Sequence, residues 1–73
     1  MHVTDYVKRL PTGKRDALKR LVNDPEYRDI ANRRGTPQSM DKLRQKLRYH
    51  QVPLSLYAND AALSTLCKTI MNF

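Results

Sequence analysis

The sequence predicts a small all-α protein, a bundle of four or five short helices in a single domain that spans residues 1–73. Apolar residues recur almost end to end at the three- and four-residue spacing of a helix face. Prolines and helix-capping residues separate these stretches, and no Asn-Gly or Asp-Gly turn lies between alternating apolar runs. A chain of this length also falls below the roughly 100 to 200 residues usual for one domain, so no second domain is expected.

Two helices are predicted in the first third of the chain. Thr4 is the expected N-cap of the first, and Pro11 ends it, because the residue before a proline avoids helical dihedral angles. Thr12 is the expected cap of the second helix, Lys14–Val22, with a loop over Pro11–Gly13. The apolar faces consist of Val3, Val7 and Leu10 in the first helix, and of Ala17, Leu18, Leu21 and Val22 in the second.

A third helix is predicted between two strong boundary signals. Asp24-Pro25-Glu26 combines a capping side chain, a proline suited to the first helical turn and a carboxylate that favours the helix dipole. Gly35 is the expected stop, and Arg33 and Arg34 would lie in the last turn. The apolar face consists of Tyr27, Ile30 and Ala31. Loops are therefore expected at Asn23-Asp24 and at Gly35-Thr36.

The last two predicted helices have clear apolar faces. Thr36-Pro37 opens a helix over Gln38–His50, which Val52-Pro53 ends, and a connector over Gln51–Ala58 follows. Asn59 or Asp60 caps the final helix. The faces consist of Met40, Leu43, Leu47 and His50, then of Leu63, Leu66, Cys67, Ile70 and Met71. The expected core consists of Leu18, Leu21, Ile30, Leu43, Leu47, Leu63, Leu66 and Ile70.

The charge of the chain is concentrated in its first fifty residues. Fourteen Lys and Arg oppose seven Asp and Glu, which gives a net charge of +7, and beyond residue 50 only Asp60 and Lys68 are charged. Such an imbalance favours an acidic partner, either a nucleic-acid backbone or an acidic protein surface. The simpler interpretation is a solvated polar face.

A binding surface is expected on this basic part. On a helical wheel Lys42 and Lys46 lie on one flank of the Gln38–His50 apolar face, Arg44 and Arg48 lie on the other, and Tyr49 points outward. The residues expected to bind the partner are Arg9, Lys14, Arg15, Arg33, Arg34, Lys42, Lys46 and Tyr49.

Catalytic chemistry is not expected. Cys67 lies on the apolar face of its helix and His50 on that of another, so a nucleophilic pair is improbable, and Lys14 lacks the surrounding pattern of a phosphate-binding loop. One cysteine and two histidines cannot supply four zinc ligands or an internal disulfide. We expect no enzyme activity, no metal, no cofactor, no small-molecule substrate and no membrane partner. The cysteine usage and the lack of a signal-peptide pattern favour a cytoplasmic location.

Two nucleic-acid interpretations stay open. Arg28–Leu47 partly fits a helix-turn-helix with Ala31 at the close contact, Gly35 in the turn and the Gln38 helix as the reading element. The fit is partial because Asp41 stands where an apolar residue is usual, and this would make the protein a DNA-binding transcription regulator. Arg28–Arg34 could also act as an arginine-rich RNA-binding stretch, although its apolar residues favour a place in the core.

The whole chain resembles the small RNA polymerase-binding transcription regulators of phages, as known from a Xanthomonas-infecting phage. The resemblance rests on the 73-residue length, the opening Met1-His2-Val3-Thr4-Asp5-Tyr6 and the basic helical character. It implies a phage protein that acts in the host bacterial cytoplasm and binds host RNA polymerase near the N-terminal segment of the β′ subunit. It further implies inhibition of transcription initiation and promotion of antitermination. It transfers no contact residues to this sequence.

Overall fold

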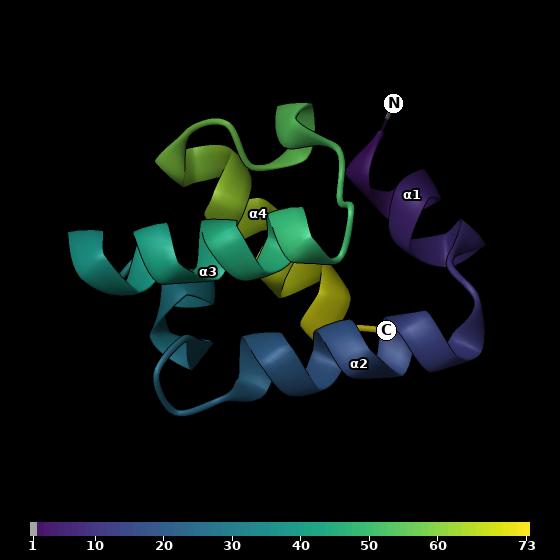
Figure 1. Ribbon diagram of the computed structural model, residues 1–73, viewed down its shortest axis with the longest axis horizontal. Coiled ribbons are helices and arrows are strands. Elements are labelled where there is room, and N and C mark those ends of the chain that lie inside the picture. The colour runs from purple at the N-terminus through teal and green to yellow at the C-terminus, as the bar shows by residue number, and fades with distance from the viewer. Residues whose placement is uncertain (1) are drawn as a thin grey trace.

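The computed structural model describes residues 2–73, and within them it contains four α-helices, two short 3-10 helices and no strand. The all-α prediction is confirmed. The elements in chain order are α1 (Val3–Arg9), α2 (Thr12–Asn23), η1 (Arg28–Asn32), α3 (Pro37–Tyr49), η2 (Leu54–Leu56) and α4 (Asp60–Met71). In Figure 1, α2 and α3 run in opposite chain directions, and α4 passes behind α3.

α4 is the central helix of the bundle. Its backbone lies close to α1, α2, η1 and η2, and its predicted apolar face is confirmed. Four residues of that face are fully buried: Leu63, Leu66, Cys67 and Ile70. Seven of the eight predicted core residues are buried, whereas Leu21 of α2 is only partly buried and packs at the edge of the core. The terminal helix therefore organises the packing of the whole chain.

The first two helices begin earlier than the sequence predicts. His2 is the N-cap of α1, because its Nδ1 accepts a hydrogen bond from the Thr4 amide at 3.2 Å, and Thr4 lies inside the first turn. Pro11 holds the N-cap position of α2, and its carbonyl accepts the Arg15 amide at 2.9 Å. Thr12 is thus the first helical residue and not a cap, and the expected loop over Pro11–Gly13 reduces to the proline.

The predicted α-helix between Asp24 and Gly35 is wrong. Asp24 Oδ1 accepts the Glu26 amide at 2.9 Å, which forms a turn, and the chain then continues into the 3-10 helix η1. Arg33, with φ 60° and ψ 30°, ends η1 in the left-handed region. The sequence predicts that Gly35 ends the helix, but Arg33 ends it instead. The Arg33 amide donates to the Ile30 carbonyl, and the Arg34 amide donates to the Asp29 carbonyl.

Gly35 has a different role. Its φ is not positive, but a Cβ at this position would lie 2.6 Å from Ile30 Cγ1 and 3.4 Å from Ile30 Cα. Real carbon atoms in contact lie about 3.5 to 4.0 Å apart. The glycine is therefore required by the close approach of the turn to η1.

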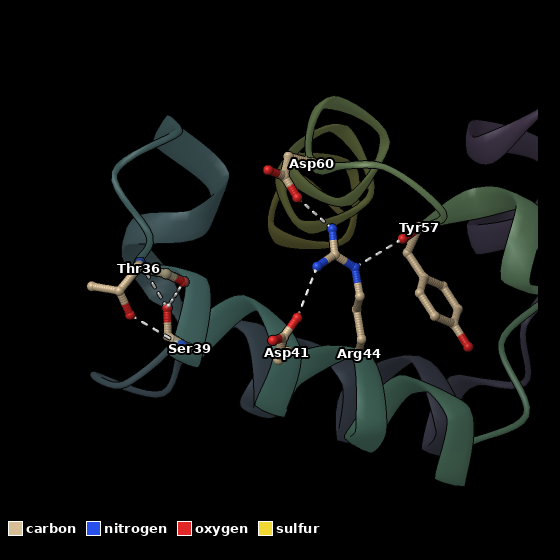
Figure 2. Close-up of polar contacts among 6 residues, drawn as sticks. All are labelled: Thr36, Ser39, Asp41, Arg44, Tyr57 and Asp60. Carbon is tan, nitrogen blue, oxygen red and sulfur yellow. Dashed lines mark hydrogen bonds and ion pairs between the residues drawn. The ribbon is translucent and has the colours of Figure 1, made fainter.

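Both ends of α3 are fixed by local hydrogen bonds. At its start Thr36 Oγ1 accepts the Ser39 amide, and Ser39 Oγ accepts the Thr36 amide, each at 3.0 Å, so the predicted cap is confirmed (Figure 2). At its end Gln51 adopts φ 61°, and the Val52 amide donates to the Leu47 carbonyl at 3.0 Å. This pattern is a Schellman motif, in which buried Val52 and Leu47 provide the accompanying apolar contact.

Candidate functional site

α3 presents most of its surface to the outside of the molecule. Leu43 and Leu47 are its buried residues, and both are fully enclosed by the core. The remaining positions carry the basic side chains that the sequence places on two flanks. The surface around α3 is therefore a candidate partner-binding site.

Arg44 connects α3 to the beginning of α4. Its Nη1 lies 3.3 Å from Asp41 Oδ1, its Nη2 donates to Asp60 Oδ1, and its Nε donates to the Tyr57 carbonyl at 3.3 Å (Figure 2). The Arg44 side chain is only 25% exposed. Its donors are thus engaged within the fold, and Arg44 acts as a structural clasp.

Lys42, on the opposite flank of α3, is also paired. Its Nζ lies 3.0 Å from Glu26 Oε1, and this hydrogen bond raises the pKa of Lys42 above its ordinary value. Both side chains are well exposed, so the pair adds little to stability. Within residues 2–73, Lys46 and Arg48 of α3 have no carboxylate within ion-pair distance. These two side chains are the α3 cations available to a partner.

A shallow groove separates α2 from α3. Buried Tyr27 lies on its lining, and so do Arg20 and Leu21 from α2, Lys46 from α3 and the α3 C-cap residue His50. Burial, followed by the charge of Glu26, raises the pKa of the Tyr27 hydroxyl, which stays protonated at neutral pH. Asp24 and Glu26 also line the groove, so its charge is mixed.

The other flank of α3 faces η2 and is more apolar. Arg48 lines two neighbouring hollows there, and both also contact Leu54 and Tyr57. Leu54 is 68% exposed, whereas Leu56 and Tyr57, which follow it in the same connector, are buried. The sequence does not predict Arg48, Gln45 or Leu54 as site residues. The flank position of Arg48 was visible on the helical wheel, but nothing in the connector indicates which of its apolar residues faces outward.

Tyr49 points outward, as the sequence predicts. Its side chain is 82% exposed, the most exposed large apolar residue among residues 2–73. The ring packs edge-on against His50, with 5.5 Å between the ring centres and an interplanar angle of 90°. An aromatic ring held in this way is suited to contact a partner.

Arg33 and Arg34, which follow η1, line two different hollows. Arg34 lines one hollow together with Gly35 and Lys42. Glu26 and Asp29 line the same hollow. Arg33 lines another, beside Met40 and Ala61. The structure therefore brings Arg34 and Lys42 together, whereas Arg33 faces a separate hollow.

The remaining predicted site residues lie apart from this region. Arg9 and Lys14 are exposed near the α1–α2 junction, and the guanidinium carbon of Arg15 lies 5.8 Å from the centre of the Phe73 ring. Figure 1 places that junction at one end of the long axis and the start of α3 at the other. The predicted residues thus form two separate groups and not one continuous face.

The chain has one thiol, and its environment bears on its reactivity. Cys67 is fully buried, and burial raises the pKa of its thiol to about 12. The thiol is therefore protonated at neutral pH and a poor nucleophile. Residues 2–73 contain no group of three His, Cys, Asp or Glu side chains that could hold a metal ion. In the same part of the chain, no helix is long and apolar enough to cross a membrane.

No family model matches this chain, and comparisons with curated proteins and with solved structures give no significant match. Inference about its function therefore rests on its own surface and on the resemblance described above.

Proposed function

We propose that this chain is a small, basic, non-enzymatic binding protein that docks on host bacterial RNA polymerase near the N-terminal segment of the β′ subunit. In this proposal it is a phage protein in the host cytoplasm that inhibits transcription initiation and promotes antitermination. The partner comes from the whole-chain resemblance. The observation that supports a docking role is the outer surface of α3, where the unpaired cations Lys46 and Arg48 flank the exposed ring of Tyr49.

This surface has the composition of a protein-docking site. Exposed charges at the rim of an interface mainly accelerate association, and salt screens their effect. A few aromatic or apolar side chains usually supply most of the binding energy. In this chain the net charge of +7 would steer the protein to an acidic surface, and Tyr49 would act as one anchor.

The alternative function is that of a helix-turn-helix DNA-binding regulator. Two features disfavour it: the segment before the turn is a five-residue 3-10 helix and not an α-helix, and Asp41, at a position where an apolar residue is usual, is exposed on α3 and paired with Arg44. The RNA-binding interpretation of Arg28–Arg34 is disfavoured as well, because Ile30 and Ala31 of that stretch are buried in the core. Direct contact with nucleic acid within a polymerase complex remains compatible with the proposal.

The deciding experiment compares two binding assays. Purified RNA polymerase, free of DNA, is passed over the immobilised protein, and the protein alone is tested for a sequence-dependent shift of duplex DNA. Retention of polymerase without a DNA shift is the expected result. A sequence-dependent shift together with no retention of polymerase would replace this proposal with the helix-turn-helix function.

A second experiment tests the predicted binding residues. Neutralising Arg33 with Arg34, or Lys42 with Lys46, should slow association with polymerase and flatten its dependence on salt, while Tyr49→Ala should mainly accelerate dissociation. The paired neutralisation of Lys8 and Lys68 removes the same charge elsewhere and is the matched control. Equal losses in all three double variants would mean that net charge alone determines binding, and the residue assignments would then be wrong.

A further inference from the structure

We propose that the hollow between α3 and η2 receives an apolar side chain from an acidic segment of the polymerase. The η2 hollow is defined by Gln45, Arg48, Leu54 and Tyr57, which together line the two adjoining depressions on this flank. This inference rests on the proposed function, because it names the part of this chain that would make the central contact.

The depressions are open to the outside and adjoin each other. They have volumes of about 440 and 180 Å³, and Arg48, Leu54 and Tyr57 line both. Gln51 and Val52 complete the lining of the larger one, and Gln45 and Arg44 complete that of the smaller one. A leucine- or phenylalanine-sized side chain could enter and contact Leu54 on one side and the stem of Arg48 on the other.

The exposure of Leu54 is built into the local fold. The Leu56 amide donates to the Pro53 carbonyl and the Tyr57 amide donates to the Leu54 carbonyl, each at 3.0 Å, which closes the 3-10 turn η2. This turn directs Leu56 and Tyr57 into the core, where they are 7% and 3% exposed. Leu54 is left outside on a fixed backbone, so little conformational freedom would be lost when a partner covers it.

The charges around the hollow select the occupant. Among residues 2–73, no Asp or Glu lines either depression. Arg44 already binds Asp41 and Asp60, so Arg48 is the cation that remains for a ligand. A fitting segment therefore carries an apolar residue for the hollow and a nearby carboxylate for Arg48.

Two other occupants fit less well. A second copy of this chain, related by a two-fold axis, would bring Arg48 against the same carboxylate-free hollow in a pair of molecules that each carry +7. A nucleic-acid backbone would find one free guanidinium beside Leu54 and Val52, whereas phosphate binding normally uses several cations. An acidic protein segment satisfies both the apolar lining and the single charge.

The test measures the dissociation constant for purified RNA polymerase, without DNA, by biolayer interferometry. Leu54→Ser should weaken binding at least tenfold, and Arg48→Gln should weaken it and reduce its salt dependence. Leu54→Met, which keeps an apolar side chain, should bind within threefold of wild type. Leu54→Met is thus the control for Leu54→Ser, and Lys68→Gln, which removes the same charge from α4, is the control for Arg48→Gln. Circular dichroism verifies that each variant is folded.

Each outcome decides the proposal. Loss of binding in Leu54→Ser and Arg48→Gln, with both controls unchanged, supports it. Wild-type binding in Leu54→Ser overturns the η2 hollow but leaves polymerase binding intact, whereas failure of the wild-type protein to bind ends both proposals. A dimer that Leu54→Ser dissociates, or duplex DNA binding that Leu54→Ser abolishes, would assign the hollow to that other occupant and overturn the present one.

Discussion

The same chemical change at the two glycines of this chain should have opposite effects on stability. Alanine at position 35 would place its Cβ 2.6 Å from Ile30 Cγ1, so the two carbons must separate by about 1 Å to reach an ordinary contact. Ile30 is 1% exposed, and its Cα is also only 3.4 Å away, so η1 itself must move. The Cβ of an alanine at position 13 would meet no heavy atom within 4 Å apart from its chain neighbours and the backbone of its own helix.

The magnitudes follow from these surroundings. Overpacking at a buried contact costs roughly 1 to 3 kcal/mol, and loss of glycine's freedom in the unfolded chain offsets about 0.4 to 1 kcal/mol of that. Gly35→Ala should therefore destabilise by about 1 to 2 kcal/mol, a large share of the roughly 4 to 11 kcal/mol expected for a chain of this size. Gly13→Ala lies in the first turns of α2 and should stabilise by about 0.5 to 1 kcal/mol.

Thermal unfolding followed by far-UV circular dichroism measures both effects. For a domain this small, each kcal/mol shifts the midpoint by about 4 to 8 °C, so Gly35→Ala should lower it by about 5 to 15 °C. Gly13→Ala should raise it by a few degrees. An unchanged or higher midpoint in Gly35→Ala would refute the close approach of the turn to Ile30. A lower midpoint in Gly13→Ala would instead refute the helical start of α2.

Three further predictions concern the core and the ends of the elements. Leu66→Ala should cost roughly 2 to 5 kcal/mol, because Leu66 is fully buried on the central helix, and a midpoint equal to that of wild type in chemical denaturation would contradict this core assignment. Arg33→Gly should stabilise the fold by about 0.5 to 1 kcal/mol by relieving the left-handed backbone, while slowing association with polymerase; destabilisation would argue against strain at this residue. The pKa of the Cys67 thiol is raised from 9.0 to about 12 by burial, so the unfolded chain loses this proton first. The free energy of unfolding of wild type relative to Cys67→Ala should therefore fall as the pH rises above about 9, and a constant difference in urea titrations from pH 7 to pH 11 would count against burial of the thiol.

The sequence predicts most of this fold because periodic apolar residues and caps act locally. The face of α4 and the Thr36 cap of α3 need no information beyond neighbouring residues, and both are confirmed. The segment between Asp24 and Gly35 has the same kind of signals but folds differently. There, packing of Ile30 and Ala31 against α4 selects a shorter 3-10 helix, and a helix pattern of so few residues cannot distinguish the two.

The candidate site is less predictable for a related reason. Tyr49 could be placed because a helix wheel fixes its direction, and it is exposed as expected. Lys42 and Arg44 also have directions that a wheel can give, but their partners Glu26 and Asp60 lie sixteen residues away in the chain. Leu54 belongs to a connector with no regular period. Which cations are free, and which connector residue is exposed, depends on contacts between distant segments.

The Arg44 clasp strengthens the attachment of a helix that few buried side chains hold. Two buried leucines and a few polar contacts hold α3, whereas α4 buries five residues in the centre of the bundle. Amide hydrogens of α3 should therefore exchange with solvent through a local opening of lower free energy than that of α4. A partner that binds across α3 and η2 would close this opening and make the outer helix as slow to exchange as the core. Affinity for that partner and order in α3 would then depend on one equilibrium, to which Arg44 contributes through its bonds to Asp60 and to the Tyr57 carbonyl.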